Sequence, residues 1–369
     1  MAGDYLINVR RVKRLYADRS IFFLAVFLTV LGFIAIADVS APQAQAYFSD
    51  SFYFVKQQIL WGVFGFLALL VAANIHYSFW RRLAPVLFGV SILLLVLVLI
   101  PGLGTKALGA RRWINFGSFS LQPSEIVKLT TALFFAWLAD KKKSLRWYAV
   151  SLGLVGALIM LQPDLGTTMV VFVIGFTQML VAGIPLLFMG GLVLAAGALG
   201  SVLIFLSDYR KERLITFLKG TTEPLGSSYH VRQILIALGS GGLLGVGLGQ
   251  SRQKYLFLAE AATDSVFAIV AEEIGFVGST ILIVIFTVFT YKILKVASRS
   301  PDIFSSTLSL GIGAWIGGQM FLNLGSMLAI VPLTGIPLPF FSYGGSSLTM
   351  VLFGVGIILN ISKYGTSKR

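Results

Sequence analysis

The sequence has no cysteine and little charge. Only 12% of its residues are charged, whereas soluble domains carry about 25%. The absence of cysteine excludes disulfide bonds and cysteine-ligated metal. The shortage of charge extends along the whole chain, and 57% of the residues are hydrophobic, with a mean hydropathy of +0.88. These values indicate an integral membrane protein rather than a soluble protein with a single anchor.

Ten long apolar runs account for most of the chain. Each is continuously apolar, which favours membrane-spanning helices over the alternating strands of a membrane barrel. The runs cover residues 21–39, 54–74, 83–101, 124–139, 147–162, 165–183, 186–206, 265–291, 305–331 and 343–361. We therefore predict an all-α fold in one domain, 1–369: a polytopic membrane bundle of about ten transmembrane helices. A long extracytoplasmic loop, 207–264, lies between helices 7 and 8. Between helices 6 and 7, a tight turn and a broken helix both fit.

Lysine and arginine indicate the orientation of the chain. With the N-terminus, 1–20, in the cytoplasm, most basic residues of the short connections fall on the cytoplasmic side, as the positive-inside rule requires. The C-terminus, 362–369, then lies in the cytoplasm as well. The basic start runs directly into 21–37, which is too long for the apolar part of a secretory signal. We therefore expect the first membrane span there.

The predicted outer loop is basic, although it lies on the side where the rule disfavours lysine and arginine. It carries Arg210, Lys211, Arg213, Lys219, Arg232, Arg252 and Lys254. Attraction to anionic lipid headgroups and a binding site for a phosphorylated substrate both explain this charge. Within the loop, Tyr229–Leu238 has the pattern of a short interfacial helix. The glycine-rich run 239–249 follows and allows sharp turns or close approach to a ligand. No strand precedes its Gly-x-Gly-x-Gly pattern, which disfavours a dinucleotide site.

Charged residues inside the predicted spans need an explanation, because a central charge costs about 2.5–3.5 kcal/mol on insertion. Glu125 and Lys128 lie three residues apart, so they share one helix face and can pair. Glu125 also follows Pro123, which is typical of a helix start. We favour a functional role for this pair. Asp164 follows Pro163 in the same way, and there we favour a dipole-compensating role at the helix start.

Asp264 ends the polar loop and begins the next apolar run. A helix N-terminus favours the ionised carboxylate, and at a water–membrane boundary this group is suited to accept a proton from a substrate hydroxyl. The alternative is an aspartate in the cap region, with Thr263 as the cap. Glu272 and Glu273 lie roughly 12–14 Å deeper. Lys128 is the basic residue inside another span, so we favour a buried structural ion pair over a proton relay for these glutamates.

Metal and serine chemistry have little support. The two histidines have no metal-ligand spacing. Ser342 and Ser346 have no nearby histidine, which disfavours a serine nucleophile. The segment around them follows three prolines and is typical of a re-entrant or boundary loop.

Several short motifs occur in a characteristic order along nearly the whole chain. They are Gly109–Ile114, Leu121–Glu125, Gln162–Thr167, Asp208–Arg210, the glycine cluster, Thr263–Ala268, Ala271–Gly275 and Ser342–Ser346. In this order the chain resembles the SEDS family (shape, elongation, division, sporulation), the FtsW/RodA/SpoVE group. One departure is clear. Many members have Pro-Glu-x-His-Thr-Asp-Phe around the aspartate, whereas this chain has Ala259–Ser265 without the proline, histidine and phenylalanine.

The resemblance implies a peptidoglycan glycosyltransferase acting on lipid II at the outer face of the cytoplasmic membrane, with Asp264 as general base for the acceptor hydroxyl. The diphosphate leaving group requires nearby cations. The expected substrate-binding residues are Arg111, Arg112, Glu125, Lys128, Arg210 and Ser342. The resemblance also implies a class B penicillin-binding protein as partner, and nucleic acid is not expected.

Other functions and a metal ion stay open at this point. A lipid II flippase or transporter would use the intramembrane acids, and a non-catalytic scaffold of the division or elongation machinery is a third possibility. No metal ligand set is visible, although a divalent cation such as Mg²⁺ or Mn²⁺ is possible beside Asp264, Glu260 and a diphosphate.

Overall fold

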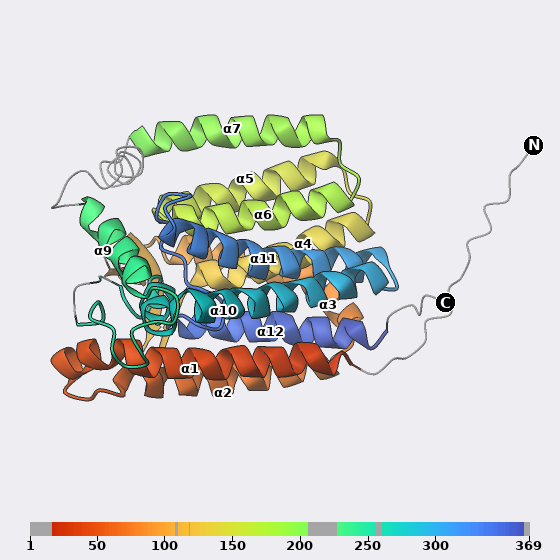
Figure 1. The fold of residues 1–369 in the computed structure, drawn as a ribbon. Coiled ribbons are helices and arrows are strands. Elements are labelled where there is room, and N and C mark those ends of the chain that lie inside the picture. The colour runs from red at the N-terminus through yellow and green to blue at the C-terminus, as the bar shows by residue number, and fades with distance from the viewer. Residues whose placement is uncertain are drawn as a thin grey trace, which may run out of the picture.

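The computed structural model describes residues 17–107, 110–117, 119–205, 227–255, 258 and 260–364. Each predicted apolar run falls on a helix, and the long helices lie roughly side by side in one bundle (Figure 1). These are α1 (Arg19–Phe48), α2 (Tyr53–Asn74), α3 (Tyr77–Leu97), α4 (Pro123–Asp140), α5 (Leu145–Leu161), α6 (Leu165–Val181), α7 (Leu186–Phe205), α10 (Val266–Arg299), α11 (Ile303–Met327) and α12 (Gly345–Ser362). The predicted helical membrane bundle is confirmed.

Length and composition single out some of these helices as membrane spans. Five of the described helices are long and apolar enough to cross a membrane: α1, α2, α3, α10 and α12. The helices α5 and α6 and the first part of α7 are apolar but shorter. Between α6 and α7, Gly183 has a positive φ of 77° and the chain reverses in a short turn. The tight-turn interpretation is therefore correct, and the broken-helix alternative is wrong.

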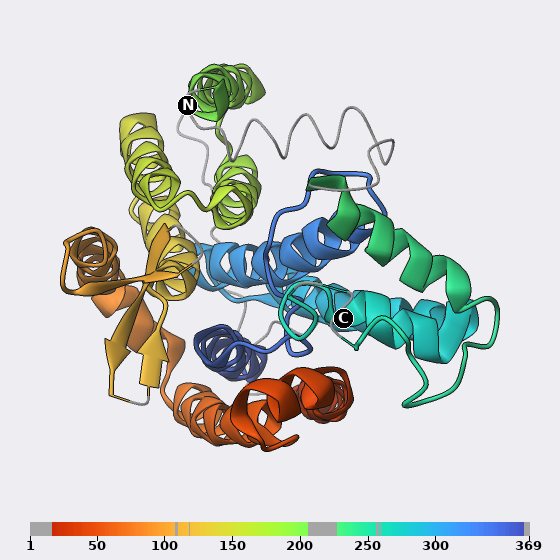
Figure 2. The same ribbon diagram turned by 90° about the vertical axis from the view of Figure 1, so that its left-hand side faces the viewer.

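The two ends of the bundle differ. At one end, the backbone N–H of Asp18 before α1 donates to the Ser362 hydroxyl at the end of α12, at 3.1 Å. The opposite end carries a small sheet and a helix, α9 (Ser227–Ser240), with the segments before α10 and α12 between them (Figure 2). The prediction of a short helix at Tyr229–Leu238 is confirmed by α9.

The sheet was not predicted. Its strands β1 (Gly104–Ala107), β2 (Ala110–Phe116) and β3 (Phe119–Leu121) pair antiparallel in that order. The strands are short and lie between two membrane helices, so their sequence lacks the long period-two pattern that identifies a strand.

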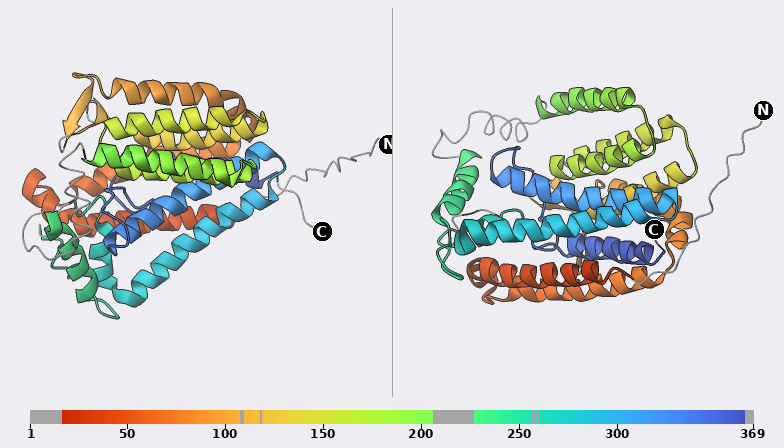
Figure 3. Two further views of the ribbon diagram at one scale, coloured as in Figure 1. Left: turned by 90° about the horizontal axis from the view of Figure 1, so that it is seen from above. Right: turned by 45° about the vertical axis from the view of Figure 1, so that its right-hand side comes forward.

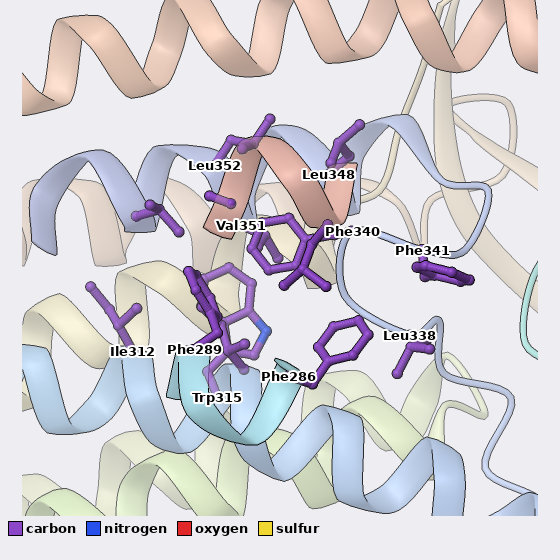
Figure 4. Close-up of a cluster of buried hydrophobic side chains, with 14 of the residues drawn as sticks. Phe286, Phe289, Ile312, Trp315, Leu338, Phe340, Phe341, Leu348, Val351 and Leu352 are labelled. Atoms are coloured by element: carbon purple, nitrogen blue, oxygen red, sulfur yellow. The ribbon is translucent and has the colours of Figure 1, made fainter. Parts of the chain in front are cut away.

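A large buried cluster joins α10, α11 and α12 to the irregular segment before α12 (Figure 4). Phe340 and Phe341 of that segment pack against Phe289 and Phe286 of α10. On the other side, a Cβ on Gly32 of α1 would overlap the carbonyl oxygen of Phe340. The predicted re-entrant or boundary segment is thus covered by protein, which irregular backbone at membrane depth requires.

Helix α10 is broken at Gly275, where φ is 69° and ψ is −172°. The glycine-rich segment after α9 completes the interrupted hydrogen bonding. Val246 and Gly247 donate backbone N–H groups to the carbonyls of Glu272 and Glu273, at 3.0 and 3.1 Å. Gly242 and Leu243 accept from the N–H groups of Phe276 and Val277, at 2.9 and 3.1 Å. The predicted continuous span is therefore two half-helices that meet at Gly275, and the glycine-rich segment bridges the break with hydrogen bonds.

Glycine is required where the loop and the helix meet. A Cβ on Gly245 would overlap the Glu273 carbonyl, and a Cβ on Gly275 would overlap the backbone nitrogen of Gly245. Both residues also have positive φ, which glycine adopts without steric cost. The glycine run therefore approaches backbone rather than a ligand.

Candidate active site

Asp264 lies just before α10, whose N-cap is Ser265, and its side chain is partly exposed. The Thr263 hydroxyl is 3.3 Å from Asp264 Oδ1 and 3.0 Å from Glu260 Oε2. The idea that Thr263 caps the helix is wrong, because its hydroxyl points at the carbonyl and carboxylate of Glu260 and the carboxylate of Asp264, and the N-cap is Ser265. Asp264 therefore sits on the loop side of the helix start.

The backbone around Asp264 is held from two directions. Asn323, buried on α11, donates its side-chain amide to the carbonyls of Asp264 at 2.9 Å and Ile336 at 2.8 Å. The N–H of Tyr343 donates to the carbonyl of Ala262, at 2.8 Å. The segment that precedes α12 therefore fixes the position of the aspartate.

A histidine from α9 also reaches this region. His230 Nε2 lies 3.1 Å from the hydroxyl of Ser265, the residue after Asp264. The sequence analysis did not connect His230 with the site, because 35 residues separate the two partners along the chain. Ser265 occupies the place of the family phenylalanine. This substitution was the one feature of the sequence that could have indicated a polar partner such as His230.

Glu125 and Lys128 form the predicted pair. Lys128 Nζ lies 2.6 Å from Glu125 Oε1 and 2.8 Å from Gln319 Oε1 on α11, and both charged side chains are buried. The ammonium group also lies 5.5 Å from the centre of the Trp315 ring. Within the described part of the chain, Glu125 Oε2 has no hydrogen-bond partner. The pair therefore keeps one buried acceptor atom.

Two amides on α11 connect this pair to the Asp264 region. Gln319 donates to the carbonyl of Pro337 at 2.7 Å, and Asn323, four residues later on the same helix face, donates to the carbonyl of Ile336. The Lys128 pair and the Asp264 backbone thus attach to neighbouring carbonyls of one segment. The structure thus brings α4, α11 and the start of α10 together, and the sequence analysis had not identified the two amides of α11 that join them.

Ser342 and Ser346 both make local contacts. The Ser342 hydroxyl accepts from the N–H of Leu338 at 2.8 Å and closes a turn. The Ser346 hydroxyl accepts from the N–H of Gln122 at 3.1 Å and lies 3.2 Å from the carbonyl of Ser120. These serines shape the backbone beside the site, and contact between Ser342 and a substrate stays a prediction.

The two arginines of β2 differ. Arg112 Nε donates to the carbonyl of Gln162 at 2.9 Å, and its Nη2 donates to that of Pro163, so it ties the sheet to the start of α6. Arg111 is partly exposed, and the described residues give it no ion pair. Arg210 lies outside the described residues.

Asp164 caps α6. Its carboxylate accepts from the N–H of Thr167 at 2.9 Å and from the Thr167 hydroxyl at 2.8 Å. The helix-start interpretation is confirmed. A Cβ on Gly166 would crowd the Thr334 carbonyl, so the start of α6 packs directly on the segment before α12.

The predicted partner of Glu272 and Glu273 is wrong. Glu273 Oε1 lies 3.1 Å from Lys254 Nζ, and the same ammonium group lies 2.7 Å from Asp38 Oδ1 on α1. Glu272 accepts from the hydroxyls of Ser240, at 3.1 Å, and Ser251. The glutamates therefore bind the loop after α9, because the break in α10 brings that loop to them. Lys128 is not available to them, because it pairs with Glu125.

The surroundings of Lys254 stabilise its charged form. Burial alone lowers the pKa of its ammonium group, but the hydrogen bonds to Asp38 and Glu273 outweigh this effect and hold the pKa above its ordinary value. Lys254 is therefore charged at neutral pH, although it is buried.

The described residues contain no group of three or more histidine, aspartate or glutamate side chains placed to hold a metal ion. Glu260 and Asp264 both lie within hydrogen-bond distance of the Thr263 hydroxyl, and two carboxylates could hold Mg²⁺ or Mn²⁺ only together with water and the substrate diphosphate.

Fold and site together define a class: a multi-pass membrane protein with an organised polar site at one end of its helices, built around a carboxylate before a broken helix. The family model described as cell cycle protein, the FtsW/RodA/SpoVE group, matches residues 18–367. The chain belongs to this family, and the resemblance stated above is confirmed.

Individual relatives match over almost the full length. Stage V sporulation protein E of Bacillus subtilis is 40% identical, covering 95% of this chain and 98% of that protein. A probable peptidoglycan glycosyltransferase FtsW of Geobacter metallireducens is 36% identical, covering 97% of each. Among solved structures, RodA of Thermus thermophilus has a TM-score of 0.70 at 28% identity, covering 94% of this chain and 96% of that one. A peptidoglycan synthase complex described as coordinating polymerization and crosslinking has a TM-score of 0.76 at 29% identity, covering 94% and 97%.

Proposed function

We propose that this chain is a peptidoglycan glycosyltransferase that polymerises lipid II, with Asp264 as general base. The observation that carries the assignment is the placement of Asp264. Its backbone is fixed by Asn323 and its neighbour Ala262 by Tyr343, while its side chain is partly exposed at the start of α10. A base that acts on a lipid-linked substrate needs this combination of a rigid support and an accessible carboxylate.

The proposed step is a displacement at the anomeric carbon. Asp264 accepts the proton of the 4-hydroxyl on the incoming GlcNAc, and that oxygen forms a bond to C1 of the MurNAc at the lipid-linked end of the glycan. The bond from C1 to the diphosphate oxygen breaks with its electron pair, and undecaprenyl diphosphate leaves. The chain grows by one disaccharide, and Asp264 must then release its proton.

The leaving diphosphate needs cations, and the described residues differ in how well they suit this role. Arg111 lies on the sheet without an ion pair and is the best candidate. Arg112 holds backbone carbonyls instead. Lys128 is neutralised by Glu125 and both side chains are buried, so contact of this pair with the substrate stays a prediction. Arg210 stays a candidate from the sequence.

The proposed orientation places both termini in the cytoplasm and the site at the outer face of the bacterial cytoplasmic membrane. The distribution of basic residues supports it. The partner would be a class B penicillin-binding protein, a transpeptidase. A solved relative that belongs to a complex for polymerization and crosslinking supports this pairing. A divalent cation held between Glu260, Asp264 and the substrate diphosphate stays a prediction, and no step of the mechanism depends on it.

A lipid II transporter is the main alternative, and two contacts argue against it. Broken membrane helices in transporters present their free ends to the substrate or coupling ion. Here the glycine-rich segment occupies the ends of the break in α10, and Lys254 neutralises Glu273. The intramembrane acids that a carrier would use therefore already make contacts that hold the fold together.

The test is glycan formation from lipid II by the purified chain, with and without the transpeptidase. Asp264→Asn keeps the shape of the side chain but removes the base, and we expect at least a hundredfold loss, in the usual range for general base catalysis of about 10²–10⁴. Asp164→Asn is the matched control: asparagine also caps helices, so polymerisation should continue.

Two outcomes would overturn the proposal. Undiminished polymerisation by Asp264→Asn and Asp264→Ala would remove Asp264 as the base. If the wild-type chain with its partner forms no glycan, but labelled lipid II crosses the membrane of vesicles that contain it, the transporter assignment is correct.

A further inference from the structure

The glycine-rich loop that fills the break in α10 has one polar side and one apolar side. We call residues 241–250 the elbow loop. Its backbone groups at Gly242, Leu243, Val246 and Gly247 are hydrogen-bonded to the two halves of α10. These polar groups are therefore satisfied on the side that faces the protein, which is the condition for placing irregular backbone near hydrocarbon.

The side chains of the elbow loop point the other way. Leu243, Leu244 and Leu248 are 71%, 81% and 79% exposed. Phe276 and Val277, which are hydrogen-bonded to the loop, are also exposed large hydrophobic residues on α10. The sequence from 239 to 251 contains no charged residue. The loop thus extends the apolar outer surface of a helix that is itself apolar enough to span a membrane.

Charged and aromatic residues flank this apolar surface. Arg252, two residues after the elbow loop, and Tyr255 are exposed, and so is Arg232, which lies on α9. The charged residues that lie inside, Lys254 and Glu273, are paired and buried. Leucines bordered by arginine and tyrosine are typical of segments at the membrane interface, where the cations meet lipid phosphates and the apolar side chains enter the acyl region. Figure 3 places the bend of α10 (teal) at a corner of the molecule, next to α9 (green).

We propose that the elbow loop is inserted into the outer leaflet of the membrane and that phospholipid is its occupant. The acyl chains surround Leu243, Leu244 and Leu248, and Arg252 binds the phosphate groups. Phospholipid fits better than a protein surface because the apolar face of the loop is continuous with the exposed face of a membrane helix, and because arginine lies at its border. Through the break in α10, this insertion supports the half-helix that begins directly after Asp264.

The proposal can be tested without measuring activity. The chain has no cysteine, so single-cysteine variants can be labelled without altering other positions. Leu244→Cys and Leu248→Cys are labelled with a nitroxide and reconstituted into vesicles of phosphatidylethanolamine and phosphatidylglycerol. Collisions with oxygen, which concentrates in the bilayer, are compared with collisions with a water-soluble nickel complex. Val284→Cys, on the exposed face of α10, is the lipid standard, and Lys56→Cys, exposed in the first turn of α2, is the water standard.

We expect the ratio of oxygen to nickel collisions at 244 and 248 to be several-fold higher than that of Lys56→Cys and to stay below that of Val284→Cys, which lies about 12 Å deeper along α10. A ratio that matches Lys56→Cys would overturn the proposal, because the loop would then lie in water. Protection from both reagents would also overturn it, because another protein segment or a second copy would then cover the leucines. Neither result depends on whether the chain polymerises lipid II.

Discussion

At the scale of single residues, Lys254 shows how a charge is kept inside this bundle. Its ammonium group binds Glu273 and Asp38, which lie on α10 and α1, so one side chain joins three parts of the protein. The free-energy cost of burying the charges of Lys254 and Glu273 is offset only while the two side chains remain paired. Removing the lysine leaves Glu273 buried without its counter-charge.

We expect Lys254→Met to destabilise the folded protein by about 3–5 kcal/mol, the usual cost of breaking a buried ion pair. Lys56→Met is the control, because Lys56 pairs with Asp50 on the surface, where solvent screens the pair, and its loss should change the thermal midpoint little. Thermal unfolding in one detergent measures both. Equal shifts of the midpoint would contradict the interpretation of Lys254 as a structural link.

His230 offers a test of how α9 supports the site. If its contact with Ser265 positions Asp264, His230→Leu should lower kcat for glycan formation about fivefold, the value of one hydrogen bond of about 1 kcal/mol, with little change in KM. His230→Gln keeps a polar nitrogen at a similar reach and should recover most of the rate.

The other histidine supplies the control for this comparison. His76 also contacts a serine hydroxyl, Ser78 at 2.7 Å, but it lies between α2 and α3, away from the site. His76→Leu should leave kcat unchanged. If His230→Leu and His76→Leu behave alike, the contact with Ser265 has no role in positioning the base.

The residues that the sequence predicted correctly have partners nearby in the chain. Asp164 binds Thr167 and Lys128 binds Glu125, each three positions away, so helix geometry alone indicates the contact. Glu273 was assigned the wrong cation because Lys254 reaches it only after the loop folds back on a broken helix. Sequence spacing carries no information about that step.

At the scale of elements, the break in α10 depends on Gly275. Any side chain there would meet the elbow loop, and the positive φ adds a steric penalty. We expect Gly275→Ala to release the elbow loop and to lower both the thermal midpoint and polymerisation strongly. Gly153→Ala, on α5 where an added Cβ would meet open space, should instead leave both unchanged. Protease cleavage at 241–250 in the first variant alone would identify the released segment.

The sequence predicted the helices better than their interruptions. A membrane helix satisfies its own backbone, so an apolar run of about twenty residues identifies it without reference to neighbours. The break at Gly275 and the three-strand sheet exist only through hydrogen bonds to other segments. Their residues, mainly glycine and short apolar stretches, also fit a continuous helix or a plain loop.

At the scale of the whole molecule, the two ends have separate tasks. Away from the site, Arg81 on α3 lies 2.9 Å from Asp302 before α11 and 3.6 Å from Asp140 at the end of α4, and Tyr77 also donates to Asp302. This network ties three helices together. The polar groups at the other end instead surround an accessible carboxylate.

This division predicts that stability and activity respond differently to changes at the two ends. Arg81→Gln should lower the thermal midpoint, because Asp302 and Asp140 lose their partner, while the rate per folded molecule stays close to that of the wild type. Asp264→Asn should leave the thermal midpoint close to that of the wild type and lower the rate per folded molecule. The measurement is glycan formation normalised to the folded fraction at a temperature below both transitions. A large loss of normalised rate in Arg81→Gln would show that the two ends are coupled.

The break in α10 also has a consequence for how the chain enters the membrane. The part from Phe276 to Arg299 exceeds the roughly twenty residues that a span requires, so it can insert as a complete helix. The half before Gly275, with Asp264 at its head and two glutamates within it, is unsuited to enter hydrocarbon on its own. In the folded protein its last carbonyls accept from the elbow loop instead. The site also uses Asn323 of α11 and Tyr343 before α12, so it is complete only once those later segments of the chain have been made.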